Sequence, residues 1–298
     1  MLRRVQKYIR NYDLLSRNGR VLVCVSGGAD SMALWDVLQR GGYDCVVAHC
    51  NFHLRGEESD RDEQAVSHSP LLQPRDDVHT PLFIKHFDTR MYAQGQHISI
   101  EMAARELRYR WFAELAQEQR CEAIAVAHHQ NDQAETVLLN LRRGAGLRGL
   151  CGMRPKSGNP VVTDSVPVIR PLLCTTRDYI EHYLRDIRHI NWVTDSTNND
   201  TNILRNAIRK QLCCHSKAEI EHIAATAERM QGYVDWLEKR DTRQAEMTKL
   251  YEELRLYRFP QTDEIYEALQ RGEGGKVFYS PTHQATIKKG KLCVTTVS

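Results

Sequence analysis

The stretch VLVCVSGGADSMALWDVLQRGG, residues 21–42, decides the fold of this chain. It opens with an apolar run rich in valine, passes through two glycines and continues with a helix-like pattern. Such a run followed at once by a glycine turn is typical of a strand–turn–helix unit in an α/β protein. We predict a helix from about Ser31 to Arg40, because Gly41 and Gly42 form a typical helix-ending signal.

Three further apolar runs follow, at residues 45–48, 82–87 and 123–127, with helix-length segments between them. Strands that alternate with helices predict βαβ units and a parallel sheet with both faces covered. The expected fold class is therefore α/β: a Rossmann-like parallel sheet with helices on both faces, plus a smaller, mainly helical C-terminal domain. Prolines mark residues 155–171 as a loop. We place the domain boundary near residue 216, giving domains 1–215 and 216–298.

Composition excludes several classes of protein. The chain has 298 residues, 41% of them hydrophobic and 27% charged, which is ordinary for a globular protein. No apolar stretch is long enough to predict a membrane span, and the amphipathic N-terminal segment 1–15 favours a surface helix over an export signal. Nine cysteines, an odd number without any C-x-x-C pair, indicate reduced thiols in a cytoplasmic protein and argue against a zinc knuckle.

The segment SGGADS lies directly after the first strand and before the first helix. Free N–H groups and the dipole at a helix start favour an anion, and glycines let a phosphate approach the backbone. The alternative is a tight turn in which Asp30 or Ser31 only caps the helix. The pattern is neither a Walker A loop nor a dinucleotide fingerprint. We predict a phosphate-binding loop made of Ser26, Gly27, Gly28, Ala29, Asp30 and Ser31.

A carboxylate inside an anion-binding loop is unusual. Asp30 makes chemical sense there if it faces a cation, such as Mg²⁺ or the ammonium group of a substrate.

Two further polar motifs lie elsewhere in the expected α/β domain. HCNFHLRG, residues 49–56, ends the second strand, where His53 and Arg55 can meet a phosphate or a base, unless this is only a polar loop. In EMAARELRY, residues 101–109, helical spacing puts Glu101, Arg105 and Arg108 on one face. Without context, a solvated charged face is the better interpretation of that second motif.

The motif HHQNDQAET, residues 128–136, follows the fourth strand. On a helix, His128, Asp132 and Glu135 lie within about 60° of one another. One helix would then present a histidine and two carboxylates beside the phosphate loop. Hard oxygen ligands next to phosphate favour Mg²⁺ over zinc, and the same groups suit a pocket for an amine. The alternative is an ordinary helix start with acidic residues.

Two stretches are basic and contain no acid, residues 140–157 and 201–218. Clusters of this kind suit phosphate backbones, although a charge run is commonly a solvated face. Their presence in a chain of net charge +3 favours RNA binding. The candidate contacts are Arg142, Arg143, Arg148, Arg205 and Arg209.

The loop resembles the pyrophosphate loop of the N-type ATP pyrophosphatases, and the motifs together resemble the tRNA(Ile)-lysidine synthetase family. The resemblance covers about residues 18–215, and more weakly the rest. One departure is Cys50-Asn51-Phe52, where the family more usually has Val-Asn-His or Val-Asp-His. The matching segments, in the expected order, are 26–31, 49–63, 99–112, 127–153, 169–173 and 195–209.

The resemblance implies a two-step ligation with ATP and Mg²⁺. ATP adenylates the C2 oxygen of the wobble cytidine in an isoleucine tRNA with a CAU anticodon, and the ε-amine of L-lysine then displaces AMP to form lysidine. Asp30 and Asp132 would hold Mg²⁺, and these two or Glu135 the lysine ammonium, while His128 would hold substrate or move a proton. Arg105 and Arg205 would contact the tRNA. The family also suggests a homodimer, and nothing points to a membrane partner.

Two alternatives remain at this stage. A tRNA thiolase of the same superfamily would need a cysteine pair or an iron–sulfur cluster, and a non-enzymatic nucleotide-binding module would not need the His128, Asp132 and Glu135 set. The second domain is expected to bind tRNA. Because the basic pattern around residues 273–294 stops in mid-pattern, we expect a truncated enzyme, competent with ATP but weak in tRNA binding.

Overall fold

The computed structural model describes residues 1–73, 79–194, 207–208, 212, 215–288 and 290–296. Contacts divide the chain into two compact units, Met1–Met230 and Gln231–Ser298. Two of the predicted RNA contacts, Arg205 and Arg209, lie outside the described residues. No helix among the described residues is both long enough and apolar enough to cross a membrane.

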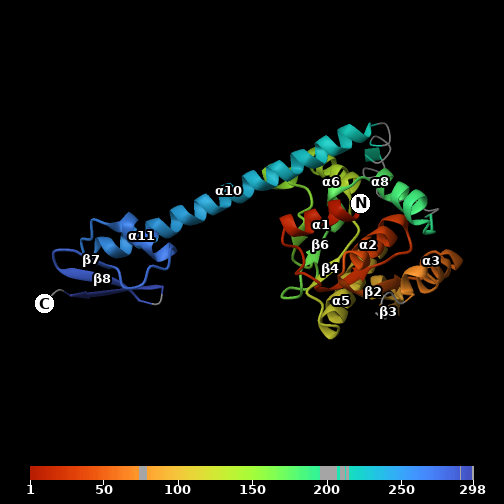
Figure 1. The fold of residues 1–298 in the computed structure, drawn as a ribbon, viewed down its shortest axis with the longest axis horizontal. Helices are drawn as coiled ribbons and strands as arrows, with labels where there is room; N and C mark the ends of the chain where they lie inside the picture. The colour runs from red at the N-terminus through yellow and green to blue at the C-terminus, as the bar shows by residue number, and fades with distance from the viewer. Residues whose placement is uncertain (74–78, 195–206, 209–211, 213–214, 289, 297–298) are drawn as a thin grey trace. The chain divides into compact units, whose positions relative to one another are not determined.

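A six-stranded sheet forms the centre of the first unit, in the order β3-β2-β1-β4-β6-β5 (Figure 1). All neighbouring strands pair in parallel except β5, which is antiparallel to β6. The predicted α/β fold class is confirmed. The strands are β1 (Arg20–Cys24), β2 (Asp44–Asn51), β3 (Leu82–His86), β4 (Ala123–Ala125), β5 (Lys156–Ser157) and β6 (Val168–Ile169).

The last two strands correct the sequence analysis, which predicted only a loop over residues 155–171. Each strand is two residues long, too short for an alternating pattern to be detected. Val168 and Ile169 are nevertheless fully buried, and they pair with Ile124 and Ala125 of β4. The sheet therefore extends on the side of β4 that faces away from β1.

The helices of this unit follow the strands in chain order. The predicted helix after the glycine loop is confirmed as α2, and it stops at Gly41. The elements are α1 (Leu2–Asn11), α2 (Ala29–Arg40), α3 (Glu57–Ser67), η1 (Pro70–Leu72), α4 (Thr89–Gln96), α5 (Ile100–Glu118), α6 (Gln130–Arg142), α7 (Leu147–Leu150), η2 (Pro171–Cys174), α8 (Arg177–His182) and the π-helical turn η3 (Tyr183–Arg188).

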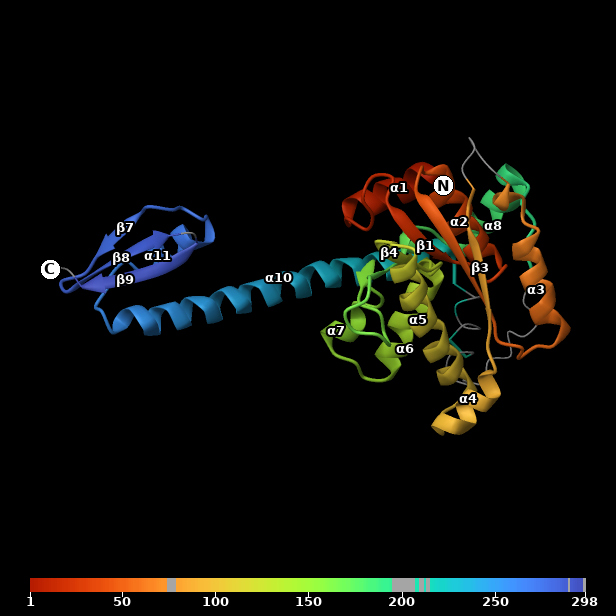
Figure 2. The same cartoon turned by 90° about the horizontal axis from the view of Figure 1, so that it is seen from below.

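Side chains of the strands alternate between two apolar layers. Val21 and Val23 of β1 point to the face covered by α1, α2 and α8, where Trp35 is fully buried. Leu22 points to the opposite face, which α5 covers with Phe112 and its neighbours (Figure 2). Burial on both faces explains why these strands are continuous apolar runs in the sequence.

Strand order fixes where a ligand can bind. The chain leaves β1 toward β2 on one side, and β4 later joins β1 on the other side. Loops that leave neighbouring strands in opposite directions open a crevice at the carboxyl ends of those strands. The glycine loop follows β1 and the motif at residues 128–136 follows β4, so both lie at this crevice.

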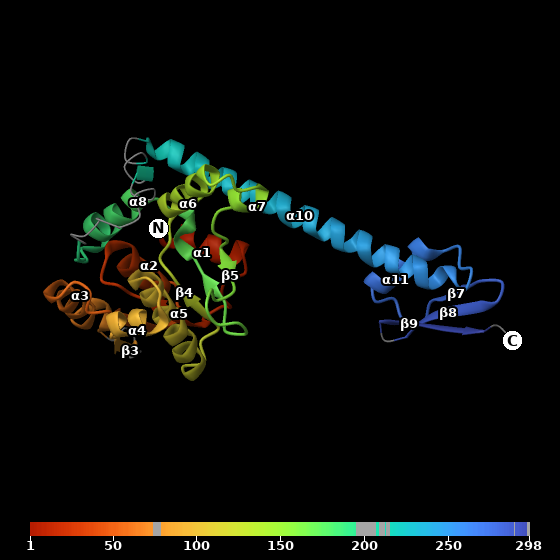
Figure 3. The same ribbon diagram turned by 180° about the vertical axis from the view of Figure 1, so that it is seen from behind.

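The second unit contains a sheet as well as helices (Figure 3). Its strands pair antiparallel in the order β7-β8-β9, and its core includes Leu254, Ile265 and Ile287. The 39-residue helix α10 begins in the first unit and continues into the second. The elements are α10 (Lys217–Arg255), α11 (Thr262–Gln270), β7 (Val277–Tyr279), β8 (His283–Lys288) and β9 (Lys291–Thr296).

Candidate functional site

The glycine loop is shaped by its own serines. Ser31 donates its hydroxyl to the carbonyl of Gly28 at 2.9 Å, and the Ser31 oxygen accepts the N–H of Ser26 at 3.1 Å. Gly27 has a φ of +89°, and a side chain there would place its Cβ 3.2 Å from the carbonyl of Asp62 on α3. The side chain of Ser31 therefore links the two ends of the loop, at Ser26 and Gly28. Only glycine fits at position 27 without strain.

Asp30 lies in the first turn of α2 and meets two cations. One oxygen of its carboxylate lies 3.5 Å from Nε2 of His129 and 3.7 Å from a guanidinium nitrogen of Arg177. The other oxygen is buried and accepts no hydrogen bond from any residue that the structure describes. Asp30 therefore has one carboxylate oxygen at the phosphate loop whose capacity to accept a hydrogen bond or bind a cation is unused by the described residues.

His129 joins Asp30 to Asp132. Its Nε2 lies 3.5 Å from a carboxylate oxygen of each residue, so those two oxygens cannot be more than twice that distance apart. The same oxygen of Asp132 also accepts the backbone N–H of His129 at 3.0 Å, which caps helix α6. The two carboxylates predicted to bind Mg²⁺ are therefore brought together by a residue that sequence analysis did not select.

Opposite charges within this cluster shift the pKa values of Asp30 and His129 in opposite directions. Burial acts to raise the pKa of Asp30, but the hydrogen bond and charge of His129 and the charge of Arg177 outweigh it, so the pKa lies below its usual value. Burial acts to lower the pKa of His129, but Asp132 and Asp30 outweigh it, so that pKa lies above its usual value. The cluster favours an ionised Asp30 beside a protonated His129 imidazole.

His128 corrects one geometric expectation. Helix α6 begins at Gln130, so His128 precedes the helix and does not share a helical face with Asp132 and Glu135. It lines a cavity of about 310 Å³ together with Asp30 and residues of the glycine loop. Burial, with only partial compensation by Asp132, lowers the pKa of His128 to about 4, so the imidazole is neutral at pH 7. Its Nδ1 has no hydrogen-bond partner among the described residues.

The opposite wall of the cavity comes from α5. Arg105 and Arg108 both line it, and both guanidinium groups lie over aromatic rings. Arg105 stands 5.0 Å from the ring centre of Tyr109, and Arg108 stands 5.1 Å from that of Phe52. Both arginines are exposed, as a solvated face predicts, and they also line the cavity at the strand ends. Glu101 is exposed as well but does not line the cavity.

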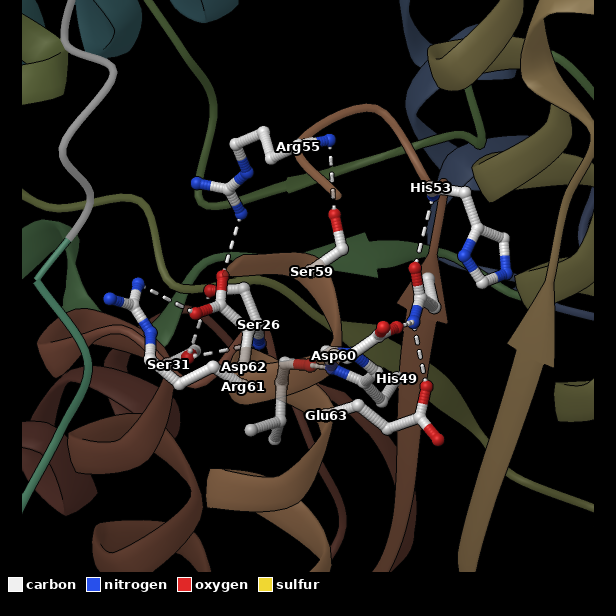
Figure 4. Close-up of polar contacts among 12 residues, drawn as sticks. Ser26, Ser31, His49, His53, Arg55, Ser59, Asp60, Arg61, Asp62 and Glu63 are labelled. Carbon is white, nitrogen blue, oxygen red and sulfur yellow. Dashed lines mark hydrogen bonds and ion pairs between the residues drawn. The ribbon is translucent and has the colours of Figure 1, made fainter. Parts of the chain in front are cut away.

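The motif after β2 divides between two places (Figure 4). Arg55 donates to the Asp62 carboxylate at 2.7 Å, close to Ser26 and Ser31, while the His53 imidazole lies away from those serines. His53 contacts His86 of β3 at 2.9 Å instead. Neither Arg55 nor His53 lines the cavity, so Arg55 reaches the loop through α3. Phe52, which departs from the family pattern, stacks on Phe87 at 5.4 Å.

Four further candidates lie on or after α6. Glu135 is only 4% exposed and does not line the cavity. Arg142, Arg143 and Arg148 are exposed at the end of α6 and in α7. None of these three arginines lines the cavity.

Cysteines of the cavity are poor nucleophiles. Cys24 and Cys50 line it from β1 and β2. Burial raises the pKa of Cys50 to about 12 and raises that of Cys24 well above its usual value. Both thiols are therefore protonated at neutral pH.

The residues present suit a hard cation. No group of three or more His, Cys, Asp or Glu side chains with metal-site geometry occurs in the part of the chain that the structure describes. Mg²⁺ commonly takes only one or two carboxylates and completes its shell with phosphate oxygens and water. Asp30, with its buried unpartnered oxygen, and Asp132 fit that arrangement.

Sequence analysis missed two residues of this site. His129 was passed over in favour of His128, and Arg177 at the start of α8 was not considered. Adjacent histidines next to an acidic residue were the only available signal for His129. Arg177 is 147 positions from Asp30 in the chain, and only folding brings them together.

Comparisons with known proteins identify the family of both units. Residues 1–216 match the family model described as a PP-loop domain, and residues 237–297 match the TilS substrate binding domain. The fold is similar to that of a U34-tRNA thiolase from Methanococcus maripaludis, with a TM-score of 0.58 and 18% identity, covering 76% of this chain and 78% of that one.

Curated relatives are more similar in sequence. A tRNA(Ile)-lysidine synthase of Parabacteroides distasonis is 40% identical over 100% of this chain and 70% of its own length. One from Porphyromonas gingivalis is 40% identical over 99% and 68%, and one from Bacteroides thetaiotaomicron is 49% identical over 70% and 46%. With matches of this extent, the chain belongs to the tRNA(Ile)-lysidine synthase family.

Proposed function

We propose that this chain uses ATP to ligate L-lysine to C2 of the wobble cytidine in an isoleucine tRNA with a CAU anticodon. The observation that carries the proposal is the Asp30–His129–Asp132 cluster at the glycine loop, which opens into a cavity walled by Arg105 and Arg108. A plain nucleotide-binding module would not require two carboxylates joined through a buried histidine. The relatives at 40–49% identity support the same reaction.

In the first step, the C2 oxygen of cytidine attacks the α-phosphorus of ATP and pyrophosphate leaves. The glycine loop and the N-terminus of α2 offer backbone N–H groups to the departing phosphates. Arg105 and Arg108 supply positive charge on the other side of the cavity, where the polynucleotide and the adenylate accumulate negative charge.

In the second step, the ε-amine of lysine attacks C2 and AMP leaves. An amine must lose its proton before it can attack. Of the carboxylates proposed to hold Mg²⁺ or the ammonium group, Asp30 lines the cavity and Asp132 is joined to it through His129, whereas the buried Glu135 would act from outside the cavity. His128 is neutral at pH 7 and has a free ring nitrogen, so it can accept a hydrogen bond from the substrate. Its low pKa favours this role over that of storing a proton.

Mg²⁺ would be held by Asp30 and Asp132. When bound, it would offset the charge that develops on pyrophosphate. The buried oxygen of Asp30 that has no partner among the described residues supports this assignment, and the contact with His129 lowers the pKa of Asp30.

The remaining assignments extend this proposal. Arg142, Arg143 and Arg148 would contact tRNA phosphates from the exposed end of α6 and α7, and Arg205 and Arg209 would add to them. The glycine loop would bind ATP. Arg55 would act on the loop through Asp62, and His53, which lies away from the loop, would contact ATP only from a greater distance. The domains would be a catalytic domain, 1–215, and a tRNA-binding domain, 216–298. Assembly as a homodimer is a further expectation, which sedimentation velocity measures.

The test is product analysis. Purified protein is incubated with ATP, Mg²⁺, L-lysine and a CAU-anticodon isoleucine tRNA transcript, and the digested nucleosides are examined by mass spectrometry. The expected product is cytidine that has gained lysine with loss of one water, formed only when ATP and lysine are both present. A parallel reaction receives sulfide in place of lysine, and a sulfur-containing nucleoside formed there would favour the thiolase. AMP release without any modified base would contradict the ligation.

A further inference from the structure

Helix α10 carries an exposed aromatic pair in the second unit. Tyr233 and Trp236 are each 53% exposed, and their rings stack with centres 6.0 Å apart and planes 27° apart. Arg240 continues the stack, with its guanidinium carbon 5.3 Å from the centre of the Trp236 ring. Large aromatic side chains are costly to leave in water, so a stacked pair on one helix face is a candidate binding surface.

The aromatic pair and a groove occupy different sides of α10. Tyr233, Trp236 and Arg240 fall within about 60° of one another at 100° per residue. Asp235, Glu238 and Glu246 lie on the other side, where they line a groove against α11 together with Lys239 and Arg243. Glu246, for example, accepts hydrogen bonds from Tyr266 and Gln270 of α11. These three acids therefore lie away from the aromatic face, on which Arg240 contacts the Trp236 ring.

We propose that this face, Tyr233–Trp236–Arg240, binds unpaired nucleotides of the RNA substrate by base stacking. Aromatic rings accept bases of any sequence, and a neighbouring arginine can both stack and donate to phosphate. Bases in a duplex cover one another, so an open ring selects an unpaired segment. The choice of RNA as partner rests on the proposed function. Arg240 lies within residues 237–297, which match a substrate-binding domain, and Tyr233 and Trp236 directly precede that match.

Trp236 itself reports on the contact. Of the four tryptophans, Trp35 and Trp111 are buried and Trp192 is half-buried, whereas Trp236 is exposed. A stacked base quenches indole fluorescence. Titration of the 1–298 chain with an unstructured 12-nucleotide RNA is expected to quench this exposed component, and Trp236→Phe is expected to remove the quenched signal.

Affinity provides the second measurement. The double variant Tyr233→Ala/Trp236→Ala is expected to weaken binding of the fluorescein-labelled 12-mer by about 10-fold or more, because each base–aromatic stack contributes substantially. Binding of an RNA hairpin that is fully paired should change far less. Arg240→Ala should lower the slope of log Kd against log salt by about one. Tyr279→Ala, which removes an equally accessible tyrosine (59% exposed) from β7, serves as the matched control and should leave affinity unchanged.

Different outcomes separate this inference from the proposed function. Unchanged affinity in the double variant, or a Trp236 signal that RNA does not quench, would overturn it. A shift from dimer to monomer in the variant with unchanged RNA affinity would assign the face to self-association and also overturn it. If the wild-type chain makes no lysidine while RNA binding still depends on Trp236, the proposed function fails and the binding surface stands.

Discussion

Replacement of His129 by glutamine tests whether the two carboxylates act as a unit. The side chain is 3% exposed, so a residue of similar volume avoids the cavity that alanine would leave. Glutamine removes the positive charge that lies 3.5 Å from both Asp30 and Asp132. A charge-assisted hydrogen bond contributes about 1.5–3 kcal/mol, so loss of the Asp30 contact alone predicts a fall in kcat/KM of about 10- to 150-fold.

The pH dependence should move in a defined direction. His129 helps to hold the pKa of Asp30 below its usual value, so His129→Gln should raise that pKa. If ionised Asp30 is required, the acidic limb of kcat/KM shifts to higher pH in the variant. The assay is lysine-dependent AMP release with the tRNA transcript, measured from pH 3.5 to pH 8 so that it approaches the low pKa of Asp30.

A surface pair supplies the control for this variant. His182, the last residue of α8, contacts Asp186 of η3 at 2.7 Å. Both side chains are exposed and neither lines the cavity, so His182→Gln should leave kcat/KM unchanged. The reasoning would be refuted by a well-folded His129→Gln protein whose kcat/KM and acidic limb both equal those of the wild type.

Three further predictions concern the cavity. Asp30→Ala and Asp132→Ala should each reduce AMP formation to background while circular dichroism shows a folded protein, and near-normal AMP release in either would remove its assigned role. The Cys24→Ala and Cys50→Ala variants should keep substantial activity, because the wild-type thiols are protonated and are not expected to take part in the reaction. Complete loss of activity in a folded variant would support the thiolase interpretation instead. Since the pKa of His128 falls from 6.5 to about 4 on folding, the unfolded state binds the proton first as pH drops through that window. The free energy of unfolding of the wild type should therefore decrease from pH 6.5 to pH 4 by roughly 3 kcal/mol more than that of His128→Gln. Urea unfolding measures both. An identical pH dependence of the two proteins would contradict a buried, neutral imidazole.

The sequence alone determined the fold class and the place of the loop. Continuous apolar runs buried on both faces, a glycine pair and a helix start are local patterns, so the unit of residues 21–42 could be predicted without tertiary information. Asp30 and Asp132 could be selected for the same reason, since each lies beside a strand end. The end of α2 at Gly41 could be predicted in the same way, because the glycine follows the helix directly in the sequence.

Tertiary structure decided which of these residues meet. His129 and Arg177 reach Asp30 from elements far apart in the chain, and Arg105 and Arg108 face the strand ends only because α5 packs across the sheet. Periodicity could not place His128 outside the helix, because the start of α6 is set by the cap between His129 and Asp132. The two-residue strand β6 has no period at all, and only its pairing with β4 makes it a strand. Contacts between distant segments depend on packing, which local patterns do not encode.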